Sequence, residues 1–460
     1  MTFTLTATPP ATHEAAVRPA PAPPPNLRRW VGRWPLLPLV AAVLIMAVPT
    51  GYGTAGAPHG GAPADLASGV AVLVCAGRLL FLRLRPLTAR AAFLFGLPVV
   101  GLAVATVTAG DPVAALPGFV RYLQIFVLVP AAVCLLVRDA TGFRIITGSL
   151  VVLALVQGAT GVHQYVTGSG ASYMGENIRA VGTFGPGDVM GMATVVAYGL
   201  LAAAAYALRA PGSAPRWLRY GSAVTAVLLV VPLAVSFSRG TWIATAVGAL
   251  AVIVLAGRRR AVRTLAVLCA SGVVLIGGFG VGSEMISQRL TSITEVTSAP
   301  DRSVNDRYTM WAAAEGMWRE RPATGVGLKG FPANRDAHSS IGLSSGSDTA
   351  GAGQDFRREP LLSPHNMYLL VLSEQGLIGF TVLVGTWVAV LAGSVRRLVL
   401  TRRRKNAALD CGLAAVGLMT WQTIDFLYAD IGGPSTVLTG IVLGLAARWA
   451  LALPERAGAS

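Results

Sequence analysis

The residues of this chain best suited to chemistry are arginines and a histidine that stand just before long apolar runs. Arg179 lies in ENIRAVGTFGPGDVMG, Arg239 in SFSRGTW and His365 in SPHNMY. Free N–H groups and the positive dipole end at the start of a helix favour a bound anion. A guanidinium also matches two oxygens of a phosphate or pyrophosphate at once. If the three helix starts converge, the sequence predicts a phosphate or pyrophosphate site.

Two short polar residues at these helix starts, Ser238 and Asn366, are predicted N-caps, because their side chains can accept a hydrogen bond from the first turn. The nearby arginines would keep the His365 imidazole neutral and able to accept a proton. The alternatives are structural: an ion pair or a lipid-headgroup contact for each arginine, and a structural helix-end residue for His365. Asp425, a carboxylate inside an apolar run, is either functional or paired with an arginine.

The stretch NDRYTMWAAAEGMWRERP predicts an amphipathic helix that is capped by Asn305 or Asp306 and ends before Pro322. Its apolar face is expected to lie on the membrane interface. That face carries Trp311, Ala314 and Trp318. Arg307 falls in the predicted first turn, where a cation opposes the helix dipole. A bound anion would explain this placement better than helix stability does.

The composition indicates a polytopic membrane protein, because 53% of the 460 residues are apolar and only 13% are charged. Soluble chains carry about 25% charged residues. Charge-free runs of roughly 17–25 residues, the length that crosses a bilayer, predict an all-α fold with about twelve transmembrane helices. They lie near 36–56, 64–82, 91–109, 119–137, 143–163, 187–208, 220–237, 241–257, 262–282, 366–394, 407–428 and 433–453.

The basic residues orient these helices, since most of the 37 fall in cytoplasmic segments when both termini are cytoplasmic. The formal charge of +16 therefore concerns topology and membrane lipids, and no nucleic-acid partner is expected. Arg121 is expected to reach from its span to the interface. The predicted organisation is a flexible Pro/Ala-rich cytoplasmic tail at 1–34, transmembrane helices one to nine at 35–282, an extracytoplasmic loop domain at 283–364, helices ten to twelve at 365–453, and a cytoplasmic tail at 454–460.

No metal or cofactor is expected. The sequence has no HExxH and no paired DxD motif. Its four cysteines, Cys75, Cys134, Cys269 and Cys411, lie in apolar runs without a CxxC pair, which favours buried core residues over ligands or disulfides.

Four of these stretches, taken in order, resemble the O-antigen ligase and O-antigen polymerase superfamily. They are RAVGTFG, SFSRGTW, DRYTMWAAAEGMW with RPATGVGLKGF, and SPHNMYLLVLSEQGLIGF. The resemblance covers roughly 175–380. It agrees with the family's GT-C-like layout of twelve helices, in which a large extracytoplasmic loop joins helices nine and ten. The chain departs from the family at GPGDVMG, where members often show a Pro-Asn pair, so the resemblance gives no support for a donor contact from that loop.

The resemblance implies an inverting, metal-independent glycosyltransferase of the inner or plasma membrane, acting at the extracytoplasmic face. The donor would be an undecaprenyl-pyrophosphate-linked glycan, and the acceptor a glycan or a lipid. Arg239 and Arg307 match family arginines that hold the pyrophosphate, and His365 matches the histidine that positions or deprotonates the acceptor hydroxyl. Four further candidates would bind substrate: Arg179, Ser238, Asn366 and Asp425. Ligases and polymerases share this chemistry, and the sequence leaves both open.

Two other classes compete with a transferase. Twelve helices also suit a secondary transporter or a flippase for lipid-linked glycan, but transporters tend to show two related halves and polar residues near the bilayer midplane. The notable charges here lie at the outer edge instead. A non-catalytic assembly protein with the same fold is the third possibility, since a fold does not determine a function.

Overall fold

The computed structural model of the chain describes residues 33–49, 63–82, 88–173, 176–185, 188–273, 302–339, 361–402, 408–433 and 435–451. The chain divides into two compact units, Met1–Trp34 and Pro35–Ser460. The predicted tails at 1–34 and 454–460 lie outside the described residues, apart from residues 33 and 34. The second unit holds nearly all of the described residues.

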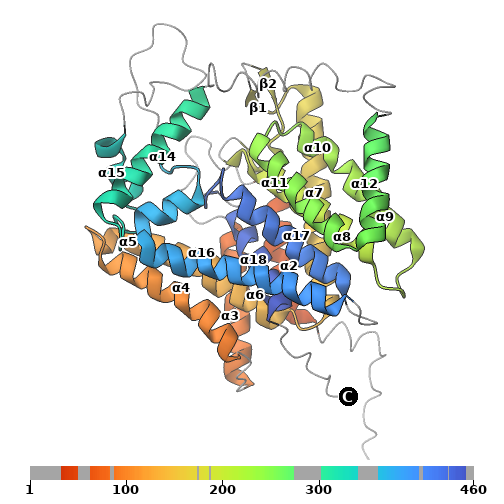
Figure 1. Ribbon diagram of the computed structural model, residues 1–460, viewed down its shortest axis with the longest axis horizontal. Coiled ribbons are helices and arrows are strands. Elements are labelled where there is room, and N and C mark those ends of the chain that lie inside the picture. The colour runs from red at the N-terminus through yellow and green to blue at the C-terminus, as the bar shows by residue number, and fades with distance from the viewer. Residues whose placement is uncertain are drawn as a thin grey trace, which may run out of the picture. The chain divides into compact units, whose positions relative to one another are not determined.

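The described part of this unit is almost entirely helical (Figure 1). Its first helices are α2 (Leu37–Leu44), α3 (Pro63–Phe81), α4 (Ala89–Val107), α5 (Pro112–Leu123), α6 (Val129–Leu136), α7 (Ala140–Thr167) and α8 (Gly191–Arg209). The later ones are α9 (Arg216–Leu228), α10 (Val230–Ala234), α11 (Arg239–Leu255), α12 (Arg258–Val273), α14 (Arg302–Glu320), α15 (Phe331–His338), α16 (Met367–Thr401), α17 (Leu409–Asp425) and α18 (Thr436–Ala450). Each of the twelve predicted apolar segments overlaps at least one of them.

Short elements complete the architecture. The 3-10 helices are η1 (Trp34–Leu36), η2 (Ile45–Ala47) and η4 (Gly182–Phe184), and η3 (Gln124–Leu128) is a π-helix. A two-stranded antiparallel hairpin, β1 (Ala171–Tyr173) and β2 (Glu176–Arg179), follows α7.

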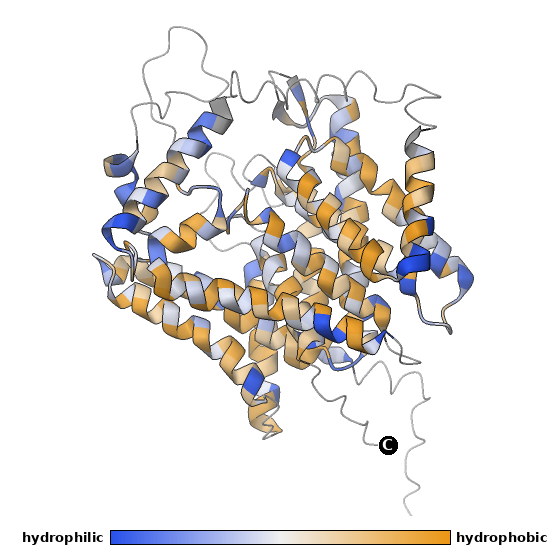
Figure 2. Ribbon diagram, in the orientation of Figure 1, coloured by the Kyte–Doolittle hydropathy of each residue, from blue (hydrophilic) through white to orange (hydrophobic). Residues whose placement is uncertain are grey.

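Seven helical segments of the described residues are long and apolar enough to cross a membrane. They are Pro63–Phe81, Ala89–Val107, Pro112–Leu136, Ala140–Thr167, Gly191–Arg209, Arg216–Ala234 and Met367–Thr401. Three shorter apolar helices accompany them: Trp34–Ala47, Arg239–Leu255 and Thr436–Ala450. Figure 2 shows the apolar residues along these helices and the hydrophilic ones concentrated on α14, α15 and helix ends. The chain is an all-α membrane protein.

Helices α8, α17 and α18 form the centre of the fold, since most of their residues are buried. Polar contacts fix their register: the Tyr198 hydroxyl of α8 donates to Oε1 of Gln422 on α17. On the other side of α17, Trp421 Nε1 donates to Thr245 Oγ1 of α11 at 3.0 Å. A buried polar pair that is satisfied in this way specifies one arrangement of helices.

Two predicted spans are interrupted. The predicted segment 119–137 is α5, the π-helix η3 and α6 in sequence, and Pro130 at the start of α6 explains the interruption, because proline lacks an N–H and crowds the preceding turn. The predicted segment 366–394 extends to Thr401 as α16 but has non-helical backbone at Gly376.

The predicted amphipathic helix is present as α14, which lies together with α15 at the upper left of Figure 1. It begins at Arg302, so the prediction that Arg307 falls in its first turn is wrong and the dipole argument for that residue no longer applies. The prediction that the face with Trp311, Ala314 and Trp318 lies on the membrane interface stays a prediction, because both tryptophans are only half-buried in α14. This helix also packs against the rest of the protein. Its buried residues are Met310, Ala313, Ala314 and Met317, and α16 is the main neighbour of α14.

Candidate active site

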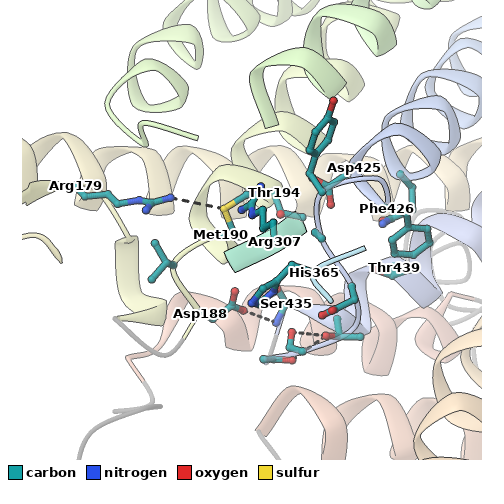
Figure 3. Close-up of a pocket in the computed structure, with 18 residues that line it drawn as sticks. Arg179, Asp188, Met190, Thr194, Arg307, His365, Asp425, Phe426, Ser435 and Thr439 are labelled. Atoms are coloured by element: carbon teal, nitrogen blue, oxygen red, sulfur yellow. Dashed lines mark hydrogen bonds between the residues drawn. The ribbon is translucent and has the colours of Figure 1, made fainter. Parts of the chain in front are cut away.

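A cavity of about 400 Å³ opens where the segments before α8 and α16 meet α14 and the turn between α17 and α18 (Figure 3). Its lining combines both signs of charge. The basic side chains are Arg179, Arg307 and His365, and the carboxylates are Asp188, Asp425 and Asp430. These residues come from parts of the chain up to about 250 positions apart, so only the fold brings them together.

Arg179 stands at the end of β2, where the hairpin meets the turn that precedes α11. Its Nε donates to the carbonyl of Ser236 at 3.2 Å, and its Nη2 approaches Met190 Sδ at 3.8 Å. The backbone N–H of Ala180 donates to the carbonyl of Val235 at 3.1 Å. The hairpin therefore holds Arg179 between the start of α11 and the segment before α8.

The SRG sequence shapes the start of α11. Ser238 is the N-cap, as predicted, and its buried side chain accepts from the N–H of Thr241 at 3.4 Å. Arg239 is the first helical residue. A Cβ atom on Gly240 would lie 2.9 Å from Cβ of Tyr428, a residue of the cavity wall. Glycine at this position therefore lets the Arg239 turn pack directly against the site.

Arg307 projects from α14 into the cavity (Figure 3). Burial lowers the pKa of its guanidinium, the positive charge of Arg239 lowers this pKa further, and Tyr428 and Asp430 act in the opposite direction. Arg239 does not line the cavity, but its positive charge acts on Arg307, and the adjacent Gly240 packs against Tyr428 of the cavity wall. Two half-buried like charges favour an anion between or beside them.

His365 lines the cavity at the start of α16 and has a positive φ of 48°. Such backbone is uncommon for a residue with a side chain and concentrates at functional sites. The following residue, Asn366, is the predicted N-cap, and its Oδ1 accepts from the N–H of Leu369 at 3.1 Å. The N–H of Met367 donates to the carbonyls of Phe426 and Ala429, at 2.9 and 3.0 Å. The start of α16 is thus docked on the cavity wall.

Asp188 joins the segment before α8 to the start of α18. Its Oδ2 accepts from the N–H of Ser435 at 3.2 Å (Figure 3). Burial raises the pKa of the Asp188 carboxyl, against the hydrogen bonds from Ser435 and Gly191. No local pattern singles out Asp188, because its partner lies 247 positions away.

Asp425 and Asp430 flank the turn after α17. Among the described residues, Oδ1 of Asp425 and Oδ2 of Asp430 are buried without a hydrogen-bond partner. Within the described residues no ion pair joins Asp425 to an arginine, and the alternative of such a pair stays a prediction for the arginines outside them. Arg121 forms an ion pair with Asp65 of α3, and its reach to the interface stays a prediction.

Residues 224–384 match the family model for O-antigen ligase. In this region the chain is similar to O-antigen ligases. This match confirms the resemblance to the O-antigen ligase and polymerase superfamily that the motifs indicated. A comparison with curated proteins finds no significant match.

The matched O-antigen ligase region contains Arg239, Arg307 and His365, the three predicted catalytic residues. Arg179 and Asp425 lie outside it but line the same cavity. Ser238 and Asn366 have a different place: both are buried helix caps that do not line the cavity. Asp188, Tyr428 and Asp430 also line this cavity, although the sequence did not predict them as site residues.

Proposed function

We propose that this chain is an O-antigen ligase or polymerase type glycosyltransferase. It transfers a glycan from an undecaprenyl-pyrophosphate donor to a hydroxyl of a glycan or lipid acceptor. The observation that carries the proposal is the shared cavity of about 400 Å³ lined by Arg307 and His365, with Arg239 close enough to act on Arg307. All three residues fall within the O-antigen ligase match.

The arginines bind the pyrophosphate. As the bond between the sugar and the pyrophosphate oxygen breaks, negative charge grows on that oxygen, and guanidinium groups fixed in a partly buried site stabilise it. The lowered pKa of Arg307, caused by burial and by Arg239, supports this role, because an anion would relieve both effects. Arg179, held by the carbonyl of Ser236, lines the same cavity and contacts the same anion. The arginines supply the positive charge that a metal ion would otherwise bring.

His365 accepts the proton of the acceptor hydroxyl. The acceptor oxygen attacks the anomeric carbon from the side opposite the pyrophosphate, the bond to the leaving oxygen breaks, and the configuration inverts. The buried oxygens of Asp425 and Asp430 that have no partner in the described part of the chain suit hydroxyls of a sugar. Ser238 and Asn366 contribute through the helix starts that they cap.

The site faces the extracytoplasmic side in this proposal. The bias of arginine toward cytoplasmic segments supports this side, and an activated donor outside the cell must be carried by a lipid. A cavity at the ends of membrane helices suits a donor with a lipid tail and a polar acceptor. Both termini are then cytoplasmic, and the segment 283–364 is an extracytoplasmic loop domain.

Deletion of the gene in its own host tests the function and separates its two forms. Accumulation of full-length glycan on the lipid carrier indicates a ligase, and accumulation of single repeat units indicates a polymerase. The accumulated lipid-linked glycan then serves as donor for purified protein in proteoliposomes. Transfer by the wild type and its loss in Arg239→Ala and His365→Ala would support the proposal, and unchanged transfer in both variants would refute the site.

Arg319→Ala is a matched control for arginine removal. Arg319 lies on the same helix as Arg307 but is 71% exposed and pairs with Glu315 of its own helix. Its removal should leave transfer within about twofold of the wild type, because an exposed pair of this kind contributes little.

A further inference from the structure

The break in α16 is filled by another part of the chain. Gly376 has a φ of 60° inside α16, a conformation that glycine adopts without strain. A break in a helix frees backbone groups, which in a membrane protein must find other partners. The turn that follows α14 supplies them. Val326 N–H donates to Ser373 O at 2.8 Å, Gly327 N–H to Glu374 O at 3.0 Å, Leu377 N–H to Pro322 O at 2.8 Å and Ile378 N–H to Ala323 O at 3.1 Å.

The fit between this turn and the break leaves no room for side chains. A Cβ atom on Gly376 would lie 2.4 Å from the carbonyl carbon of Ala323, and one on Gly325 would lie 2.5 Å from the carbonyl oxygen of Ser373. The turn and α16 therefore form one rigid joint. On one side of this joint stands α14 with Arg307, and on the other the segment of α16 that begins after His365.

A buried carboxylate completes the joint. Glu374 is 2% exposed, and its Oε1 accepts from the N–H of Phe331, the first residue of α15, at 3.2 Å. Phe331 is itself completely buried. Burying a carboxylate is costly unless hydrogen bonds compensate, and an apolar residue would fill the same space more cheaply. The position of Glu374 therefore requires an explanation beyond packing.

We propose that Glu374 is a positioning residue for the transfer reaction. By holding α15 and the preceding turn against the break in α16, it keeps Arg307 and His365 at the separation that one pyrophosphate and one acceptor hydroxyl require. Glu374 does not line the cavity and acts only through the two helices. This role rests on the transferase function proposed above.

Two conservative variants separate the effect of the length of the Glu374 side chain from the effect of its charge. Glu374→Gln keeps the length and an acceptor oxygen, so its kcat should stay within about threefold of the wild type. Glu374→Asp keeps the charge but withdraws the acceptor, and its kcat should fall about tenfold or more, with a change of less than about twofold in the donor KM. The reverse order, with Glu374→Gln the poorer enzyme, would overturn the proposal.

Thr386→Ala is the matched control on the other side of the break. Thr386 is buried, and its hydroxyl donates to Val382 O at 2.7 Å within α16 itself. This variant loses a buried hydrogen bond without touching α14 or α15, so its kcat per folded protein should match the wild type. A loss equal to that of Glu374→Asp would mean that any weakening of α16 lowers kcat and would overturn the specific role.

A double-mutant cycle with Arg307→Lys tests the coupling directly. Lysine keeps a charge but not the paired N–H donors of arginine. If Glu374 acts by placing Arg307, the factor lost through Glu374→Asp should shrink at least threefold in the Arg307→Lys background. The same factor in both backgrounds overturns the proposal.

A distance measurement keeps this test separate from the transferase function. Spin labels are placed at Glu315→Cys on α14 and Leu427→Cys beside the start of α16, in a Cys269→Ser background. The distance between them in proteoliposomes measures how firmly α14 is held against α16. Both labelled side chains are exposed, and the remaining cysteines are buried. Glu374→Asp should broaden the distance distribution and Glu374→Gln should not. If the distances behave in this way but the wild type transfers no glycan, the proposed function is refuted and the joint is supported. If the wild type and both variants show the same distance distribution, the positioning role is refuted.

Discussion

The indole N–H of Trp311 donates a hydrogen bond to the carbonyl of Pro364 at 2.9 Å. Trp311 stands one helical turn after Arg307 on α14, and Pro364 directly precedes His365. A single contact therefore ties the arginine that would hold the leaving group to the histidine that would take the acceptor proton. Together with the joint at Gly376, it fixes the described loop helices on α16 at two points.

Loss of the Trp311 hydrogen bond should lower transfer without unfolding the protein. Trp311→Phe keeps the aromatic ring and removes the N–H donor, so we expect kcat to fall about tenfold, the range that a small misplacement of catalytic groups produces. Trp318→Phe is the control, because the N–H of Trp318 has no partner among the described residues. Its kcat should remain at the wild-type value. Steady-state transfer in proteoliposomes distinguishes the two, and equal kcat values would show that this contact has no part in the reaction.

Removal of the Arg307 side chain should cost about 10²–10³ in kcat, the usual effect of deleting one donor to a developing negative charge. Arg307→Lys should recover part of this loss as a point charge. The exposed Arg319→Ala provides the baseline for altered charge on α14. Transfer rates that are alike in Arg307→Ala and Arg319→Ala would exclude Arg307 from the site.

Gly240→Ala should displace Arg239. The added Cβ atom would lie 2.9 Å from Cβ of Tyr428, so the start of α11 must move away from the cavity wall. We expect at least a tenfold loss of transfer with the protein still inserted in the membrane. Gly221→Ala on α9 meets nothing within 4 Å and should leave transfer unchanged. It should even stabilise the helix by up to about 1 kcal/mol, as alanine does relative to glycine.

The helices were predictable from the sequence because a bilayer imposes length and apolar composition on every span. The convergence of Arg179, Arg307 and His365 was predictable only through the resemblance and the shared topology, since no local pattern measures a distance across the fold. Asp188 and the ion pair of Arg121 with Asp65 depend on partners 247 and 56 positions away. The break at Gly376 left no signal either, because a glycine in an apolar run looks the same in a straight helix.

Asp188 should make stability depend on pH. Because burial raises its pKa above the ordinary value of 3.8, the folded protein binds this proton more tightly than the unfolded chain. The ionised form therefore destabilises the fold, and stability falls as pH rises from the unfolded pKa through the folded one. Asp188→Asn keeps an acceptor for Ser435 and should remove the decrease in stability with rising pH that Asp188 causes. Melting curves of both proteins from pH 4 upward test this, and parallel curves would contradict it.

Substitution of His365 should separate the effect of its backbone conformation on folding from the effect of its imidazole on transfer. His365 has a φ of 48°, and asparagine tolerates this conformation better than alanine does. His365→Asn should therefore fold with nearly the wild-type melting temperature, yet lose about 10²–10⁴ in kcat because no general base remains. His338→Asn on α15, whose imidazole lies 2.8 Å from Asn334 O and outside the cavity, is the matched control and should keep full transfer. Wild-type kcat in His365→Asn, measured beside His338→Asn, would remove the histidine from the mechanism and leave the acceptor proton to one of the cavity carboxylates.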